Sequence, residues 1–410
     1  MSTARRAAQT PAARSAASPY LRLIGVLLGG ALAATLAALA ATVLHLARTV
    51  VTPARRVPDT DIVSLDPVAQ TVTLTRTPDT TLPGRYGLFT GGSPEYLKLG
   101  TVVAETDATV TRKLLTEVDR STRLPRPAGF SGWYYDQPEQ LHLPFERVLI
   151  GAPVGPCPAW LFPAEPGSAS DAADGLWVIQ VHGRGARRTE TLRAVPLFRR
   201  LGYSSLLVSY RNDGDAPRSR DGVYGLGATE WRDVDAAITF AVRRGARRVV
   251  VMGWSMGGAI AVQLALNSVH RDRISALVLD SPVADWPLVL RTQADAMRVP
   301  RPITDLALTT LRSERASSAA SLGRGIPFAD LDAVSRAGEL TVPILILHSD
   351  DDGFVPSDAS HALAAARPDL VTLDAFSTAR HTKLWNYDEQ RWSTMISEWL
   401  TAQGLTEAKA

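Results

Sequence analysis

Short apolar segments alternate with amphipathic segments over the second half of the chain. The apolar segments are rich in Val, Ile and Leu, which predicts strands buried on both faces, as in a parallel sheet covered by helices. Between two of them, Trp231, Val234, Ile238 and Ala241 recur every three or four residues, the spacing of one helix face. This alternation predicts a doubly wound, mostly parallel α/β sheet. The predicted strands are 176–183, 204–211, 247–255, 274–282, 342–350 and 370–377.

One long segment interrupts this alternation. Residues 284–340 separate two predicted strands by much more than one helix and its loops require. The stretches "WPLVLRTQADAM" and "PITDLALTTLRSE" within it have helical patterns. We therefore assign residues 141–405 to one α/β domain in which residues 284–340 form a helical cap.

The segment before this domain has a β pattern. Polar and apolar residues alternate with period two in "QTVTLTRT" at 70–77, and residues 96–114 are rich in β-branched side chains. We predict a small β-rich N-terminal region over residues 61–140. Its pattern does not indicate a function.

The most apolar segment lies near the N-terminus. Residues 23–44 contain no charged residue and are long enough to cross a bilayer as a helix. A secretory signal peptide usually has an apolar stretch of only ~7–15 residues. We therefore favour a transmembrane anchor over residues 23–47; cleavage near small-residue triplets such as that at 38–40 is the alternative. We expect residues 1–22 to be disordered and residues 48–60 to be a linker.

The charges around this segment favour one orientation. Four arginines precede the apolar segment and three follow it before the first acidic residue. The positive-inside rule then places the N-terminus in the cytoplasm and the α/β domain outside it. We accordingly predict a single-pass membrane protein with an extracytoplasmic body.

Composition narrows the classes of function and of partner. The 410 residues include 44 Lys and Arg against 41 Asp and Glu, so the chain lacks the excess of basic residues that is typical of nucleic-acid binding. Cys157 is the only cysteine, which excludes an intrachain disulfide and a cysteine-based zinc site. The seven histidines form no HExxH motif. We expect no metal and no cofactor, and the sequence does not indicate an oligomeric state.

Candidate chemistry is found where the predicted strand 247–255 meets the following helix, in the sequence Gly-Trp-Ser-Met-Gly. Such a tight strand–turn–helix holds its central residue, Ser255, in a strained backbone conformation and needs small neighbours, here Gly253 and Gly257. It presents the Ser255 hydroxyl at the carboxyl end of the sheet and directs the backbone N–H of Met256 toward an attacked group. The alternative is that Ser255 only caps the helix.

A serine nucleophile needs a histidine base and an acid that orients it. His381 follows the last predicted strand on a polar loop and is the candidate base. Asp350, Asp351 and Asp352 follow the preceding strand and are candidates for the acid. Asp280, at the end of an earlier strand, is a weaker candidate because capping of the following turn explains it.

The order, spacing and motifs resemble the α/β-hydrolase superfamily over about residues 145–405. The acid loop of this family often reads His-Gly-x-x-Asp-x-x-Val, so the resemblance implies that Asp352 is the acid, with Asp351 second. The matching positions are His348, Asp352 and Val355, with Ser349 in place of the glycine.

The resemblance also implies an oxyanion hole. The corresponding strand of the family commonly ends in His-Gly-x, and "VHGRG" provides His182, Gly183 and Arg184. By this resemblance, the backbone N–H of Arg184 joins that of Met256. The lipase-type His-Gly-Gly-Gly is absent, and the pattern is closer to the peptidase- and acyltransferase-related branch than to the lipases. The Arg184 side chain is interpreted as a surface arginine; recognition of a substrate carboxylate is the alternative.

We therefore hypothesise a membrane-anchored serine hydrolase that cleaves an ester or related acyl bond of a small-molecule or acyl substrate. Ser255 is the nucleophile, His381 the base and Asp352 the acid. The alternatives are an acyltransferase or a peptidase that uses the same triad, and a non-catalytic binding module on a hydrolase scaffold. The sequence does not identify the acyl group or the leaving group.

Overall fold

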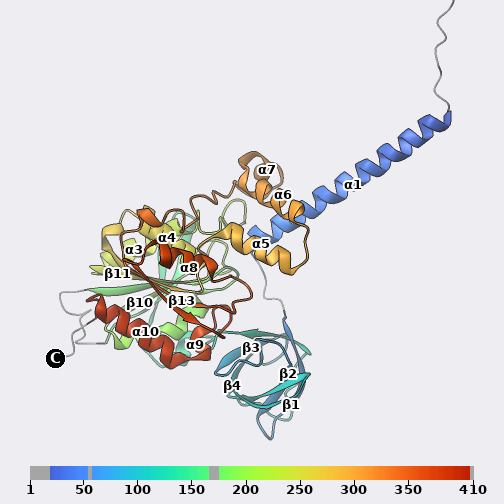
Figure 1. Ribbon diagram of the computed structural model, residues 1–410. Coiled ribbons are helices and arrows are strands. Elements are labelled where there is room, and N and C mark those ends of the chain that lie inside the picture. The colour runs from blue at the N-terminus through green and yellow to red at the C-terminus, as the bar shows by residue number, and fades with distance from the viewer. Residues whose placement is uncertain (1–18, 54–57, 166–174, 407–410) are drawn as a thin grey trace, which may run out of the picture.

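The computed structural model describes residues 19–53, 58–165 and 175–406 (Figure 1). A long N-terminal helix, a β-barrel and an α/β domain follow one another along the chain. The predicted disorder of residues 1–18 and part of the predicted linker lie outside the described residues. The predicted domain boundaries stay predictions, and the bounds below are those of the observed helices and strands.

The N-terminal helix α1 (Pro19–Val51) is longer than the predicted anchor. Its segment Val26–Val51 is apolar enough to cross a membrane, a test that a signal sequence near an N-terminus also passes. Residues 19–22, expected to be disordered, and residues 48–51, expected to be linker, are helical instead. Proline suits the first turn of a helix, and burial against the rest of the chain stabilises the last turns.

Contacts with the α/β domain explain this C-terminal extension. Val43, Ala47 and Val51 recur every four residues along α1 and are buried. Ala47 and Val51 belong to the same hydrophobic cluster as the strands of the α/β domain. Helix α6 packs along this end of α1, while the N-terminal part of α1 extends away from the molecule (Figure 1).

A closed barrel follows, with strand order β1-β2-β5-β4-β3-β6. Alternate residues point inward, as in β2, and pack a separate core that includes Val72, Leu74 and Leu88. The predicted β-rich N-terminal region is therefore confirmed. The strands are β1 (Thr60–Asp66), β2 (Thr71–Thr75), β3 (Tyr86–Thr90), β4 (Tyr96–Glu105), β5 (Thr109–Leu114) and β6 (Pro127–Ser131).

The α/β domain is built on an eight-stranded sheet of order β14-β13-β12-β11-β9-β10-β8-β7. Strands β9 to β14 pair in parallel, and β7 and β8 are antiparallel at one edge. The strands are β7 (Glu146–Ala152), β8 (Gly155–Phe162), β9 (Leu176–Val181), β10 (Ser204–Val208), β11 (Arg248–Trp254), β12 (Ile274–Asp280), β13 (Ile344–Ser349) and β14 (Val371–Phe376).

Both faces of this sheet pack against helices. Consecutive residues of β9, such as Leu176 and Trp177, belong to two different hydrophobic clusters, one on each side of the sheet. One cluster includes residues of α3 (Trp231–Arg243), α4 (Met256–Asn267) and α8 (Asp358–Ala366). The other includes residues of α2 (Val195–Arg200), α9 (Leu384–Tyr387) and α10 (Glu389–Ala402).

The stretch between β12 and β13 contains three helices, α5 (Trp286–Ala296), α6 (Arg301–Arg312) and α7 (Glu314–Ala319). Figure 1 shows them near the C-terminal end of α1, which α6 contacts. Short 3₁₀ helices occur at η1 (Pro138–Leu141), η2 (Arg188–Ala194), η3 (Arg271–Arg273) and η4 (Ala337–Glu339).

Candidate active site

Ser255 lies in the turn between β11 and α4, with φ 53° and ψ −117°. A non-glycine residue at positive φ is strained, and such strain is typical of a nucleophile elbow. A Cβ atom on Gly253 would lie 2.3 Å from the Gly257 carbonyl oxygen, and one on Gly257 would lie 2.1 Å from the Val181 oxygen. The turn therefore needs both glycines. The Ser255 side chain makes no capping hydrogen bond to α4, so the helix-cap alternative is wrong.

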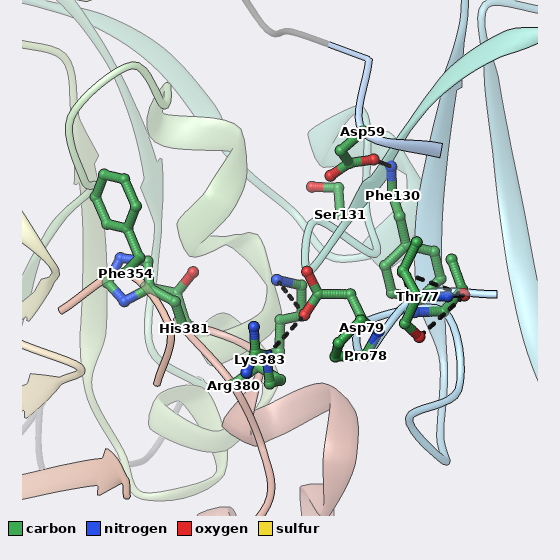
Figure 2. A network of polar contacts seen from close by, with 12 residues as sticks. Asp59, Thr77, Pro78, Asp79, Phe130, Ser131, Phe354, Arg380, His381 and Lys383 are labelled. Carbon is green, nitrogen blue, oxygen red and sulfur yellow. Dashed lines mark hydrogen bonds and ion pairs between the residues drawn. The ribbon is translucent and has the colours of Figure 1, made fainter. Parts of the chain in front are cut away.

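The fold brings Ser255 together with the predicted base and acid. His381 Nε2 lies 3.1 Å from Ser255 Oγ, and His381 Nδ1 lies 2.7 Å from Asp352 Oδ2. Asp352 follows β13, and His381 follows β14. The three side chains thus meet at the carboxyl ends of parallel strands. The Phe354 ring lies beside the imidazole, with ring centroids 5.1 Å apart, and is 44% exposed (Figure 2).

Asp352 is buried and held from several sides. Its Oδ1 accepts hydrogen bonds from the backbone N–H groups of Phe354 and Val355, both at 2.8 Å. Its Oδ2 also lies 3.3 Å from Nε2 of buried His348. Burial alone would raise the pKa of Asp352, but the charge of His381 and the hydrogen bonds from His348 and His381 outweigh burial and hold this pKa well below its usual value.

The other acidic candidates have different partners. Asp351 Oδ1 accepts hydrogen bonds from the backbone N–H groups of Ala379 and Arg380, just before the histidine. Asp350 contacts Ser357 and His361. Asp280 accepts hydrogen bonds from Trp392 Nε1 and from the adjacent Ser281 hydroxyl, so the expected turn-capping role for it is wrong.

The predicted oxyanion loop lies beside the serine. A Cβ atom on Gly183 would come within 3.2 Å of Ser255 Cβ, so this glycine permits close approach of the two loops. The Gly183 N–H donates to Glu190 Oε2 at 2.8 Å. Glu190 is buried and also accepts from Trp133 Nε1 at 3.3 Å. Glu190 could not be predicted from the sequence, because its contact with the loop arises only through the fold.

The Arg184 side chain contacts the C-terminal end of α1. Its guanidinium donates hydrogen bonds to the carbonyl oxygens of Thr49, Val50 and Thr52, at the end of α1. The guanidinium is therefore engaged by α1, a contact that neither expectation for this side chain, a surface arginine or a carboxylate-binding arginine, included. The contact spans more than 130 residues of sequence, which local patterns do not report.

The described residues contain no cluster of three or more His, Cys, Asp or Glu side chains arranged to hold a metal ion. The site brings a hydroxyl, an imidazole and a carboxylate together in line. Such a chain moves a proton from the hydroxyl to the imidazole while the carboxylate stabilises the resulting cation.

Comparisons with known proteins divide the chain in the same way as the fold. The family model described as "alpha/beta hydrolase fold" matches residues 177–299. A second model, a domain of unknown function, matches residues 61–131, the region of the barrel. A protein of Mycoplasma pneumoniae, "Putative esterase/lipase 2", is 31% identical over 112 residues, which are 27% of this chain and 40% of that protein. The chain thus spans about two fifths of the length of this curated relative.

Solved structures give similar matches. An esterase of Pyrococcus furiosus is 16% identical, with a TM-score of 0.49, 65% of this chain and 94% of that chain being covered. The protein Est1E of Butyrivibrio proteoclasticus is 17% identical, with a TM-score of 0.46, over 63% of this chain and 98% of its own. The placement closer to the peptidase- and acyltransferase-related branch stays a prediction. The family match and the observed sheet agree on an α/β-hydrolase fold for the α/β domain, the fold that the sequence motifs predicted.

Proposed function

We propose that this protein is a membrane-anchored serine hydrolase that cleaves an ester or a related acyl bond, with its site at the edge of a doubly wound sheet. The observation that carries the proposal is the continuous line of contacts from Ser255 Oγ through His381 to Asp352, at 3.1 and 2.7 Å. An ester is favoured because the relative from M. pneumoniae is named a putative esterase/lipase.

The proposed mechanism uses each group once in each half of the reaction. His381 Nε2 takes the hydroxyl proton as Ser255 Oγ attacks the carbonyl carbon, and the N–H groups of Met256 and Arg184 stabilise the oxyanion. His381 then gives this proton to the leaving alcohol, which leaves an acyl-enzyme. In the second half, His381 deprotonates a water molecule that attacks the acyl-enzyme, releasing the acid and restoring Ser255. Asp352 stabilises the imidazolium throughout.

The anchor is part of the proposal. Ala47 and Val51 at the end of α1 lie in the core of the α/β domain, which favours a helix that stays with the mature protein. The charges that flank it favour an extracytoplasmic site. The substrate is then a small molecule or an acyl compound that reaches the outer face of the membrane.

Labelling of the full chain in detergent with a fluorophosphonate probe tests the proposal. We expect the probe to modify Ser255, and Ser255→Ala to remove both labelling and the cleavage of activated esters, because no other group replaces the nucleophile. Cleavage by Ser255→Ala at the parent rate would contradict the proposal. Product analysis with an added alcohol or amine separates hydrolysis from acyl transfer, and a panel of amides tests peptidase activity.

A further inference from the structure

The loop that carries His381 has an unfavourable backbone. The residues on either side of the histidine, Arg380 and Thr382, have φ values of 59° and 51°. Non-glycine residues adopt this left-handed region at a cost, and they stay there only when surrounding contacts hold them. His381 must also remain within hydrogen-bonding distance of Ser255 and Asp352 at once. The contacts that hold this loop therefore decide whether the proposed triad is assembled.

Some of these contacts come from the β-barrel. Asp79, on the loop between β2 and β3, accepts a hydrogen bond from Arg380 Nε at 3.3 Å, and the same carboxylate oxygen lies 3.5 Å from Lys383 Nζ. Figure 2 shows Asp79 between these two basic side chains, with His381 on the adjacent part of the loop. All three side chains are more than two thirds buried, so solvent screens their attraction less than that of a surface pair.

The barrel also fixes the position of Asp79. The backbone N–H groups of Thr77 and Thr80 each donate to the hydroxyl of the other residue, at 2.8 and 3.1 Å, which closes the turn that carries Asp79. Arg112, fully buried inside the barrel, donates to the carbonyl oxygens of Thr80 and Leu82 at 2.9 and 2.7 Å. Asp79 is thus presented from a rigid turn rather than from a free loop.

A second contact holds the far side of the same segment. Asn386 Nδ2 donates to the Arg85 carbonyl oxygen at 2.7 Å, and the Arg85 side chain pairs with Glu389 at the start of α10. The barrel therefore contacts the chain both immediately before His381 and five residues after it. The remaining contacts come from the α/β domain itself, such as Thr382 N–H to Ser281 Oγ at 3.0 Å.

We infer that the β-barrel is a positioning module for the proposed catalytic base, and that Asp79 is its positioning residue. This inference rests on the proposed function, because it assigns a role to His381. It gives the region that the model of a domain of unknown function matches a task at the site: to keep the loop of residues 380–383 in its strained conformation.

The test compares Asp79→Ala with Asp61→Ala in the full chain in detergent. Asp61 is a matched control, because its carboxylate faces Arg126 of the barrel at 3.5 Å and does not touch the histidine loop. Small displacements of a reacting group are costly, so we expect Asp79→Ala to lower kcat for an activated ester and the rate of fluorophosphonate labelling, each on the order of tenfold. KM should stay unchanged, and Asp79→Glu should restore most of the rate.

The kinetics and melting temperatures of these variants decide whether Asp79 positions the histidine loop. If Asp79→Ala matches Asp61→Ala in kcat and in labelling rate, the inference is overturned. If Asp79→Ala lowers the melting temperature strongly, the paired change Arg380→Gln with Lys383→Gln approaches the same contact from the other side. A normal kcat in that variant also overturns the inference. Failure of the proposed function itself is recognised separately, as activity that survives in Ser255→Ala.

Discussion

Asp352 keeps a negative charge where almost no water reaches it. Its side chain is fully buried, and its two oxygens accept from two backbone N–H groups and from two histidines. These contacts lower its pKa in the folded state against the opposing effect of burial. The carboxylate therefore binds its proton less readily in the folded chain than in the unfolded one, and it contributes stability wherever it is ionised.

Asp352→Asn should therefore affect both activity and the pH dependence of stability. We expect kcat to fall about 10⁴-fold, as when an amide replaces the acid of a serine triad and selects the wrong tautomer of the histidine. Because the folded-state pKa is lowered, the stabilising effect is complete above the pKa of the unfolded carboxyl, ~3.9, and is lost as the pH falls toward the folded-state value. The difference in melting temperature between parent and variant should thus be largest near neutral pH and shrink below pH ~4. A constant difference across this range would contradict the argument.

The residues that could not be predicted from the sequence are those whose contacts depend on the fold. The order Ser255, Asp352, His381 follows from elements that can be recognised locally, so these three could be predicted and the fold brings them together. Glu190 supports the oxyanion loop, and Asp79 contacts a loop about 300 residues further along the chain. No local spacing connects such pairs, because their proximity is created by tertiary packing.

At the scale of elements, the turn between β11 and α4 tolerates almost no added volume. A Cβ atom on Gly257 would lie 2.1 Å from the Val181 oxygen and 2.8 Å from the His182 oxygen, backbone atoms of the last residue of β9 and of the residue after it. Backbone atoms in a central strand cannot move aside without disturbing the sheet. Glycine is needed here for close approach of helix and strand, independently of any catalytic role of the serine.

Gly257→Ala should consequently destabilise the α/β domain by about 3 kcal/mol or more, the range of severe overpacking. Gly338→Ala is the control, since a Cβ atom there meets nothing within 4 Å. We expect it to stay within about 0.5 kcal/mol of the parent. Urea unfolding followed by tryptophan fluorescence measures both. Equal unfolding midpoints for the two variants would show that the turn is less tightly packed than the structure indicates.

The elements differed in how well the sequence predicted them. Continuous Val, Ile and Leu runs indicated the strands of the α/β sheet, because burial on both faces leaves a strong local signal. Closure of the barrel was not predicted, since the pairing of β1 with β6 joins residues more than 60 positions apart. The last turn of α1 was taken for linker because its stabilising contacts lie on α6 and on the loop of Arg184.

At the scale of the whole molecule, both N-terminal parts contact loops of the proposed site. The barrel touches the histidine loop through Asp79, and α1 touches the oxyanion loop through Arg184. The last carbonyl groups of a helix have no partner within the helix, and a cation near them also interacts favourably with the helix dipole. Arg184 contacts two such carbonyl groups, of Thr49 and Val50, and that of Thr52 just after the helix, and therefore joins α1 firmly to the α/β domain.

Arg184→Gln should loosen this junction. The variant loses charged hydrogen bonds to Thr49, Val50 and Thr52, so we expect it to be destabilised by about 2 kcal/mol, with a smaller loss for Arg184→Lys. Its kcat should fall as well, because the side chain holds the loop whose backbone N–H, at the same residue, is a proposed oxyanion donor. Arg48→Ala is the matched control: Arg48 also joins α1 to the domain, through the Ala320 oxygen, but away from the oxyanion loop. Melting temperature and ester kinetics of the full chain in detergent distinguish the two, and an Arg184→Gln variant as stable and active as Arg48→Ala would show that α1 is only a tether.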